Sequence, residues 1–411
     1  MKQREKDRLR RLAQEQADIA ASQKNIERTE LWKRHNAGKG ERPPIHIEVD
    51  TFANELITPL LECEDGFARE LEYNLIKNFI NIKEFDDDWV TPPYYRQGLD
   101  CHFNLFGHEI KESIMKNSDG VELGHSFGHL ISDLGEDFDK ITSPSDYGAD
   151  KEKTLEKIYA AESIFGDILP VRLVTNSLYA VPTQQVVHMM GMENMLYAMY
   201  DYPDEFKEMM DRIANAYTEY FKYLENENLL LQNHSFELLA QGSLCFWNEK
   251  EKPGKICTED LWGYMDSQET VSISPEMFSE FIFPCYKKIA GLFGRLSYGC
   301  CEPVSAFWSD IKTLPNLKKV SVSPWCDEEY MAQQLCGTDI IYLRKPSPNY
   351  LGVGKELDEE AFRAHIEKTL RVAKGCKLEI AQRDVYTVSR SAAKVRRYVE
   401  IIRESIENCC K

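Results

Sequence analysis

The segment 296–303, Leu-Ser-Tyr-Gly-Cys-Cys-Glu-Pro, places a short apolar strand directly before two thiols and a carboxylate. Gly299 ends the strand, and Pro303 cannot donate a backbone hydrogen bond to a sheet. Soft metal ligands therefore stand at the carboxyl end of a strand. In barrels of alternating strands and helices, this is the end at which chemistry is usually placed.

Strands and helices alternate regularly on both sides of this segment. Upstream, Ser274 supplies an N-cap side chain and Pro275 occupies the first position of a helix. Such alternation indicates a mostly parallel sheet. The expected strands are 45–49, 169–175, 229–234, 261–266, 319–323, 339–343 and 377–381, and the clearest helices are 204–224, 328–335 and the one that Asp358 caps.

With this many strands, we expect an α/β fold, a closed (β/α)8 or TIM barrel with an N-terminal helical extension. An open doubly wound sheet is the alternative, but no glycine-rich phosphate-binding sequence follows any strand. We expect a helical arm at residues 1–42 and the barrel at residues 43–411. Within the second range, residues 122–129 carry two histidines four apart, and the glycines around them argue against a helix that would align both on one face.

Composition limits the classes of partner. The net charge of -18 argues against nucleic acid and anionic membranes, because both repel a surface rich in carboxylates. Twelve cysteines without a leading apolar segment fit a reducing compartment better than a disulfide scaffold. No run approaches the ~20 apolar residues that span a bilayer. We therefore expect a cytoplasmic protein.

Candidate functional side chains follow the ends of the expected strands. They include thiols, carboxylates, a phenol and cations, a mixture that suits metal-assisted or acid/base chemistry and lacks the histidine of a Ser or Cys triad. Zinc held by one or two thiolates and a carboxylate is chemically reasonable. Neighbouring residues of a strand point to opposite faces, so the spacing leaves open which thiol faces inward. The candidates are Gln268, Glu269, Tyr298, Cys300, Cys301, Glu302, Trp325, Arg344, Arg383 and Asp384.

A family resemblance begins at two of these positions. The run Asp-Ser-Gln-Glu at 266–269 and the helix start Ile-Ser-Pro-Glu-Met-Phe at 273–278 resemble the uroporphyrinogen decarboxylase superfamily. The similarity extends over about residues 169–406. It implies a (β/α)8 barrel and two kinds of activity: cofactor-free porphyrinogen decarboxylation, and zinc-dependent transfer of methyl groups to or from a corrinoid or a coenzyme thiol.

The methyltransferase branch is the closer match. Its strand ends in His-x-Cys, a motif that Tyr298-Gly299-Cys300 resembles with tyrosine in place of histidine. A second cysteine near the last strand of the family is absent, and Asp384 stands in that region. The arginine-rich loop of the decarboxylases is also absent. The sequence lacks the Asp-x-His-x-x-Gly motif of corrinoid-binding modules, so the resemblance implies a corrinoid carried by a partner protein.

The resulting hypothesis is a methyltransferase that moves a methyl group between a small methylated substrate and a corrinoid protein, and the resemblance implies a homodimer, which family members often form. Zinc is assigned to Cys300 with Cys301 or Glu302, and Asp384 is a further possible ligand. Catalytic roles fall to Glu269, Tyr298 and Asp384, and substrate contacts to Gln268, Trp325, Arg344 and Arg383. The alternatives are a metal-free decarboxylase and a degenerate barrel that binds a corrinoid or partner without turnover.

Overall fold

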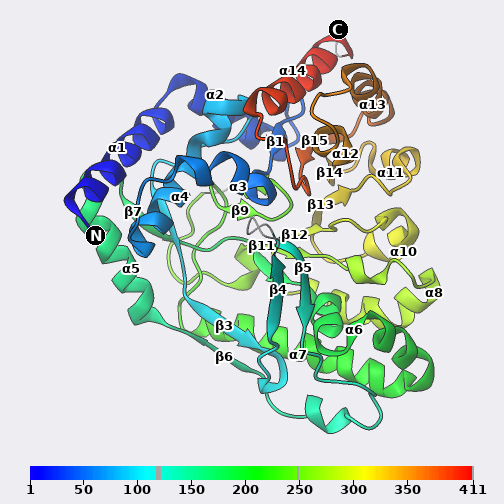
Figure 1. Cartoon of the computed structure of the whole chain (residues 1–411). Helices are drawn as coiled ribbons and strands as arrows, with labels where there is room; N and C mark the ends of the chain where they lie inside the picture. The colour runs from blue at the N-terminus through cyan, green and yellow to red at the C-terminus, as the bar shows by residue number, and fades with distance from the viewer. Residues whose placement is uncertain (117–121, 248–249, 410–411) are drawn as a thin grey trace.

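The computed structural model describes residues 1–116, 122–247 and 250–409. Its centre is a seven-stranded sheet in the order β1-β15-β14-β13-β12-β11-β8, in which every neighbouring pair is parallel. Helices surround this sheet (Figure 1). The strands are β8 (Leu178–Ala180), β11 (Trp262–Met265), β12 (Arg295–Tyr298), β13 (Leu317–Val322), β14 (Ile341–Arg344), β15 (Lys377–Gln382) and β1 (Ile45–Ile47).

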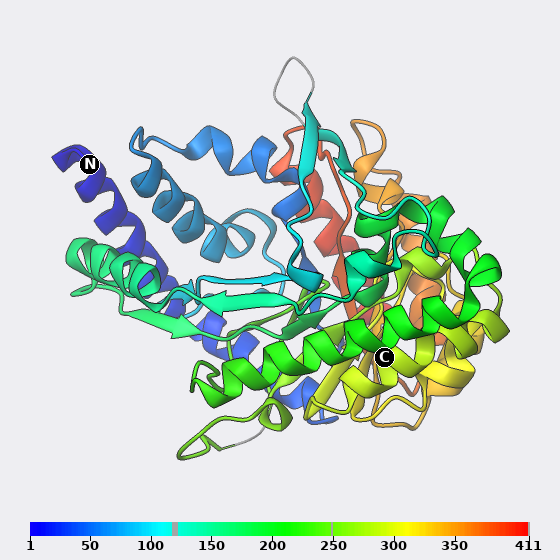
Figure 2. The same cartoon turned by 90° about the horizontal axis from the view of Figure 1, so that it is seen from below.

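Four strand pairs lie outside this sheet. One is parallel and joins β2 (Tyr95–Gly98) to β7 (Val171–Val174). The other three are antiparallel: β3 (Cys101–Asn104) with β6 (Asp146–Ala149), β4 (Glu112–Lys116) with β5 (Glu122–Phe127), and β9 (Leu238–Leu239) with β10 (Ser243–Leu244). Figure 2 shows the β4–β5 hairpin standing out from the body of the molecule. The two histidines of 122–129 thus do not share a helix; the side chain of His125 lies outside the described part of the chain.

The helices carry the apolar faces that the sequence predicts. In α7, Phe206, Met209 and Ile213 are fully buried, as their helical spacing indicates. Asp358 caps α13 by accepting a hydrogen bond of 3.0 Å from the backbone N–H of Ala361. The helices are α1 (Gln3–Ala20), α2 (Gln23–Asn36), α3 (Ala53–Leu56), α4 (Gly66–Ile80), α5 (Lys151–Phe165), α6 (Pro182–Asp201), α7 (Pro203–Asn226), α8 (Pro275–Met277), α9 (Phe283–Ala290), α10 (Trp308–Ile311), α11 (Glu328–Leu335), α12 (Asn349–Gly352), α13 (Glu359–Val372) and α14 (Ala392–Cys409).

The expected closed barrel is not what the structure shows. The first strand, β1, pairs with the last, β15, as closure of a barrel requires, but no hydrogen-bonded strand in the described residues joins β1 to β8. The free edge of β1 is occupied by an acidic turn instead. The carboxylates of Asp88 and Asp87 accept hydrogen bonds of 2.9 and 2.8 Å from the backbone N–H groups of Ile45 and Ile47. Because these N–H groups already have hydrogen-bond partners, the free edge of β1 cannot pair with an eighth strand.

The gap between β1 and β8 is bridged by the β9–β10 hairpin. The backbone N–H of Ser177, just before β8, donates to the carbonyl of Leu238 over 3.0 Å. At the other end, Nδ1 of His46 in β1 lies 2.6 Å from the carbonyl oxygen of Gly242. The expected strand at 229–234 is wrong, since those residues have no regular structure apart from a bend. The segment that follows takes the eighth place as a short antiparallel hairpin.

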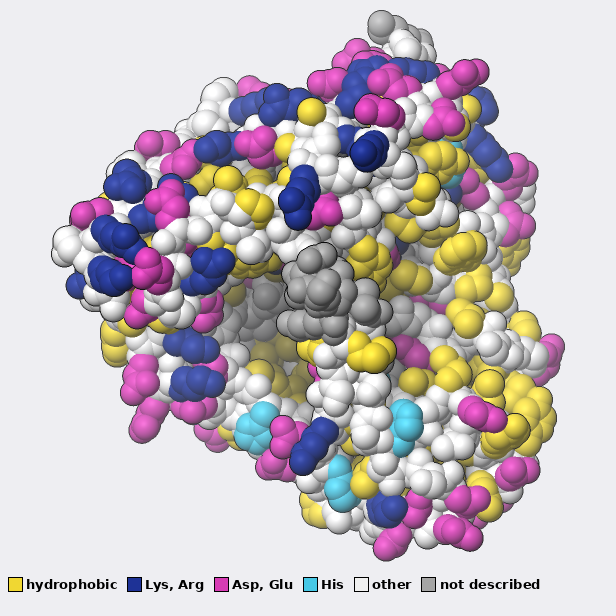
Figure 3. Space-filling view, viewed as in Figure 1, with side chains coloured by type: hydrophobic (Ala, Val, Ile, Leu, Met, Phe, Trp, Pro, Cys, Tyr) yellow, Lys and Arg dark blue, Asp and Glu magenta, His cyan; other side chains and the backbone are white. Residues whose placement is uncertain are grey.

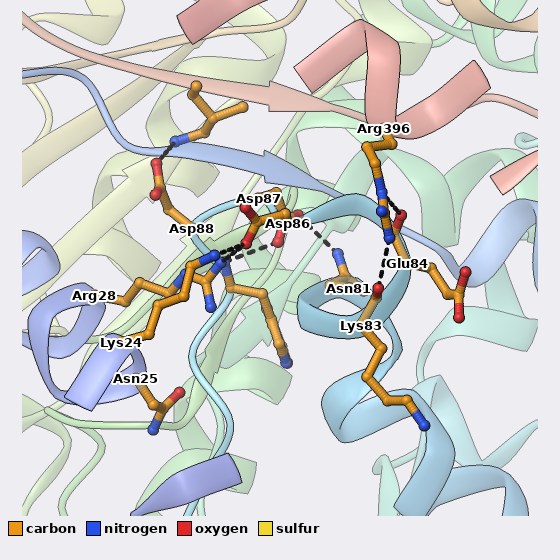
Figure 4. A network of polar contacts seen from close by, with 12 residues as sticks. Lys24, Asn25, Arg28, Asn81, Lys83, Glu84, Asp86, Asp87, Asp88 and Arg396 are labelled. Carbon is orange, nitrogen blue, oxygen red and sulfur yellow. Dashed lines mark hydrogen bonds and ion pairs between the residues drawn. The ribbon is translucent and has the colours of Figure 1, made fainter. Parts of the chain in front are cut away.

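The N-terminal arm packs on the outside of the molecule. Helix α1 contacts α4 and α5 and buries Leu9, Leu12 and Ala13 in the main core. Figure 4 shows the arm tied to the turn after α4: Lys24 and Arg28 of α2 form ion pairs with Asp86, the latter over 2.6 Å. From the other side, Arg396 of α14 donates to the carbonyl oxygens of Lys83 and Glu84.

Candidate functional site

The carboxyl ends of the sheet strands bring most of the predicted residues to one edge of the sheet. Because β11, β12, β13, β14 and β15 are parallel, the residues that follow them meet at the same edge. These residues form a mouth in which thiols, carboxylates and two cations lie close together. The residues that follow the strands are Asp266, Gly299, Ser323, Lys345 and Arg383.

Two adjacent thiols occupy the mouth together. The sulfurs of Cys300 and Cys301 lie 3.6 Å apart, and the Cys301 sulfur lies 3.3 Å from Oδ2 of Asp384. Strand β12 has already ended at Tyr298, so the alternation of side chains no longer separates the two thiols. Gly299 makes this turn with a φ of 100°, and a Cβ there would lie 3.1 Å from Val304.

The protonation of the two thiols is coupled. The hydrogen bond with Cys301, helped by the nearby charges of Lys345 and Arg383, lowers the pKa of Cys300 to about 7, although burial and Asp266 oppose it. The same sulfur-sulfur contact raises the pKa of Cys301. Cys300 is therefore the thiol that ionises first, while Cys301 keeps its proton and can donate it to Cys300 or to Asp384.

Glu302 has a structural role at this mouth. It is fully buried, and its two carboxylate oxygens accept hydrogen bonds of 2.8 Å from the N–H of Cys300 and 2.9 Å from the N–H of Ser267. Burial, together with the charges of Asp266 and Cys300, raises the pKa of Glu302 to about 8. Both oxygens of this expected metal ligand are thus already engaged in holding the ends of β11 and β12 together.

Two further carboxyl groups lie beside the thiols. Oδ2 of Asp266 accepts a hydrogen bond of 2.6 Å from the hydroxyl of Tyr264, while its Oδ1 is buried without a hydrogen-bond partner among the described residues. Oε2 of Glu269 accepts a hydrogen bond of 2.7 Å from the hydroxyl of Thr183. Burial raises the pKa of both carboxyl groups. Burial therefore disfavours the ionised form of both groups.

Two expected residues point away from the mouth. The fully buried Tyr298 packs against Tyr286 of α9, and its hydroxyl lies 2.6 Å from the Oγ of Ser267. The guanidinium of Arg344 donates to the carbonyls of Val322 and Ser323 and pairs with Glu328 of α11. Both therefore lie on the helix side of the sheet. The cation that follows β14 at the mouth is Lys345, whose ammonium donates a hydrogen bond of 2.9 Å to the carbonyl of Cys300.

An open, mostly apolar hollow of about 540 Å³ lies on one side of the thiols. Trp325 is 73% exposed at its rim, so its indole is available for contact with a ligand. In Figure 3, hydrophobic side chains are plentiful on the right of the view, whereas charged side chains are plentiful over the N-terminal helices at the upper left. The hollow is lined by Met192, Gln268, Glu269, Val271, Cys301, Glu302, Pro303 and Trp325.

The donor set matches zinc in type. Ligand atoms on one tetrahedral zinc are about 3.3–3.8 Å apart, as bond lengths of ~2.0–2.3 Å require. The spacings of Cys301 to Cys300 and to Asp384, 3.6 and 3.3 Å, fall in this range. Within the described ranges, however, no group of three or more His, Cys, Asp and Glu side chains is disposed to hold a metal ion. The thiols and Asp384 thus suit zinc chemically without forming a finished site.

Sequence reasoning missed several residues of the mouth, namely Glu48, Tyr179 and Gln241. Gln241 accepts a hydrogen bond from Lys345, and Arg383 forms ion pairs of 3.3 Å with Glu48 and 3.2 Å with Asp384. Glu48 directly follows β1, so the strand-end rule could have found it. None of the helices in the described residues is long and apolar enough to cross a membrane.

Comparisons with known proteins found similar folds among solved structures. No protein-family model matches the chain, and no curated protein matches it. Among solved structures, a methyltransferase from Methanosarcina mazei is similar over 93% of this chain and 98% of its own, with 13% identity and a TM-score of 0.50. A B12-independent methionine synthase from Shewanella sp. W3-18-1 matches over 75% and 78%, with 12% identity and a TM-score of 0.32. The likeness to the methyltransferase structure shows a similar α/β fold, which fits the resemblance that the sequence suggested.

Proposed function

We propose that this protein is an enzyme that transfers a methyl group between a small methylated substrate and a corrinoid carried by a partner protein. The observation that carries the proposal is the Cys300 thiol, whose pKa is lowered to about 7 by Cys301 at the carboxyl end of a parallel sheet. A thiolate is the form of cysteine that acts as a nucleophile or binds a soft metal. The similar fold of the methyltransferase from Methanosarcina mazei supports methyl transfer as the reaction of this thiolate.

Each residue of the mouth has a part in this proposal. Cys300 supplies the thiolate, and in the metal-free protein Cys301 favours its ionisation by donating a hydrogen bond. Glu302 holds the turn that presents both sulfurs. Glu269, whose pKa is raised by burial, lines the open hollow and is a candidate general acid for a reactant bound there. Gln268 and Trp325, at the open hollow, are placed to contact a second reactant.

The proposal includes zinc as a cofactor. Cys300, Cys301 and Asp384 are the residues that would hold it, because their donor types and spacings suit zinc. When bound, zinc would act as a Lewis acid that activates a thiol or oxygen nucleophile by lowering its pKa. Glu302 is left out of this ligand set, since both of its oxygens accept backbone hydrogen bonds.

The experiment that tests this function measures metal content and methyl transfer in the same preparations. Protein is purified without chelator, and zinc is measured by elemental analysis in the wild type and in Cys300→Ser and Cys301→Ser. Transfer from a panel of methylated amines, thiols and alcohols to reduced cobalamin is followed by absorbance. Cys336→Ser is the control, because this exposed thiol lies outside the mouth.

We expect about one zinc per chain in the wild type and the control, and loss of zinc and transfer together in Cys300→Ser, since a catalytic zinc needs its thiolate ligand. Retention of both in Cys300→Ser would contradict the proposal. A wild type without metal that still transfers methyl groups would retain the thiolate as the reactive group and remove zinc from the mechanism.

A second candidate function is a metal-free decarboxylase. It is favoured by three carboxyl groups with raised pKa values, Asp266, Glu269 and Glu302, and by the guanidinium of Arg383, whose charge acts on Asp266; a guanidinium can hold a substrate carboxylate, and a carboxyl group can return a proton. It predicts loss of carbon dioxide from a tested acid that chelator leaves unchanged, and no methyl transfer.

A further inference from the structure

A second, more enclosed cavity of about 260 Å³ lies on the other side of the thiol pair, in the gap between β1 and β8. Two residues of its lining adjoin the thiol cluster. Arg383 lines the cavity and pairs with Asp384, which contacts Cys301. Gln241 lines it and accepts a hydrogen bond from Lys345, which in turn donates to the carbonyl of Cys300. The thiols thus lie between this cavity and the open apolar hollow.

Charges in the cavity come in matched pairs. Besides His46, its lining holds two acidic and two basic side chains, and each acid contacts a base. Glu48 pairs with Arg383 over 3.3 Å, and Asp50 forms an ion pair with Lys77. A ligand with a net charge would leave one charge uncompensated, which is costly beside Arg383 and Glu48, whose side chains are only 17% and 15% exposed. A ligand that carries both signs can be matched at both ends.

Arg383 has unused hydrogen-bonding capacity. A guanidinium carries five N–H donors, yet the buried Nε of Arg383 makes no hydrogen bond to a described residue, because its ion pair of 3.2 Å with Oδ1 of Asp384 lacks hydrogen-bond geometry. Both of its ion-pair contacts are longer than 3.1 Å, beyond the usual length of a charge-assisted hydrogen bond. A buried donor without an acceptor calls for a partner. A ligand carboxylate would supply that acceptor.

Tyr179 supplies a surface that can bind the positive end of such a ligand. Its ring lines the cavity, is 49% exposed and stacks on Tyr264 with ring centres 5.0 Å apart. Stacking uses one face of the ring and leaves the other for a cation, which the negative face of an aromatic ring attracts. The carboxylates of Glu48 and Asp50 line the same cavity and add to this attraction. Aromatic and acidic side chains together favour a methylated ammonium group, which is large, apolar at its surface and positively charged.

We infer that this cavity binds a small betaine, a molecule with a methylated ammonium group and a carboxylate. The carboxylate is held by Arg383 and the ammonium group by Tyr179 with Glu48. The inference rests on the proposed function, to which it adds the chemical class of the methylated substrate. It also assigns the two reactants to different sides of the thiols, with the betaine in the enclosed cavity and the second reactant at the open hollow.

Binding is tested by isothermal titration calorimetry with three probes and no corrinoid present. Glycine betaine carries both charges, 3,3-dimethylbutyrate has the same shape and carboxylate without the positive charge, and tetramethylammonium has the cation alone. We expect glycine betaine to bind at least tenfold more tightly than either of the others. Equal or tighter binding of 3,3-dimethylbutyrate or tetramethylammonium, or no binding of glycine betaine, would overturn the inference.

Variants locate the site. We expect Glu48→Gln to weaken glycine betaine binding at least tenfold and Tyr179→Leu to weaken glycine betaine and tetramethylammonium more than 3,3-dimethylbutyrate. The matched control Glu280→Gln removes a carboxylate that pairs with Lys207 on the outer surface, and it should bind like the wild type. Unchanged binding in both Glu48→Gln and Tyr179→Leu would place the ligand elsewhere and overturn the assignment.

The two proposals can fail separately. Glycine betaine that binds to the wild type and to Cys300→Ser, without any methyl transfer, would support the cavity and contradict the proposed reaction. Methyl transfer from another donor, with no glycine betaine binding, would support the reaction and contradict the assigned substrate class.

Discussion

The ammonium of Lys345 donates a hydrogen bond of 2.9 Å to the carbonyl oxygen of Cys300, so a buried cation is fixed beside the thiol of lowest pKa at the mouth. Its positive charge favours the thiolate over the thiol. The same ammonium also binds Gln241 of the hairpin that fills the gap in the sheet. One side chain therefore links the electrostatics of the thiol to the wall of the neighbouring cavity.

Replacing this cation should make Cys300 less reactive at neutral pH. In Lys345→Met we expect the pKa of Cys300 to rise from about 7 toward the ordinary value of about 8.5. Alkylation of Cys300 by iodoacetamide at pH 7, followed by mass spectrometry, should then slow by up to roughly tenfold. Lys207→Met, at an exposed ion pair on the outer surface, is the control. An unchanged pH profile in Lys345→Met would show that this cation does not act on the thiol.

The hydrogen bond between the two thiols should matter more than the cation. It is the largest cause of the lowered pKa of Cys300, so Cys301→Ala should raise that pKa further than Lys345→Met does. The measurement is the midpoint of the pH dependence of alkylation at Cys300 in both variants. A midpoint in Cys301→Ala at or below that of the wild type would contradict the coupling of the two thiols.

Glu302 should make the protein less stable as the pH rises. Its pKa is about 8 in the folded protein and about 4.3 when unfolded, so the folded state binds the extra proton between these values. This contribution is complete below pH 4 and is lost as the pH rises through 8. We expect the Tm of the wild type to fall between pH 5 and 8 more steeply than that of Glu302→Gln, which cannot titrate. Parallel curves from differential scanning calorimetry would disprove this reading of Glu302.

A buried ion pair at the other end of the sheet should dominate stability. Lys319 and Glu379 are almost completely buried, their charged atoms are 2.7 Å apart, and His35 of α2 contacts Glu379 over 3.2 Å. Removing one partner of such a pair leaves an uncompensated charge and typically costs about 3–5 kcal/mol. Urea unfolding of Lys319→Met should show a loss of this size, while the exposed pair removed in Lys207→Met should cost about 0–1 kcal/mol. A loss below 1 kcal/mol in Lys319→Met would contradict this prediction.

Much of the fold follows from local pattern. Strands β13, β14 and β15 and helices α7, α11 and α13 lie where apolar periodicity and caps predict them. The prediction of a strand at 229–234 was wrong, because closure of the barrel depends on partners that are distant in the sequence. Whether β1 accepts a strand or the carboxylates of Asp87 and Asp88 at its free edge cannot be read from the apolar run at 45–49.

The candidate site was likewise predictable from local pattern only in part. The strand-end rule predicted the positions of the thiols and Asp384, but not the side on which each residue lies. Alternation along β14 places Arg344 toward the helices and Lys345 at the mouth, a choice that depends on the last residue of the strand. Tyr179 and Gln241 gave no signal, because their cavity exists only where β8 and the β9–β10 hairpin approach β1.

The pairing of β1 with β15 also orders the events of biosynthesis. Ile45 and Ile380 are neighbours in the sheet although they are more than 300 positions apart in the chain. At elongation rates of ~5–20 residues per second, the first strand waits on the order of tens of seconds for its partner. Glu48 and Arg383 meet only after that pairing, so the cavity is completed last. A growing chain therefore exposes one edge of β14 until late in synthesis, and contacts of such long range fold slowly, which makes this interval the one in which a chaperone would matter most.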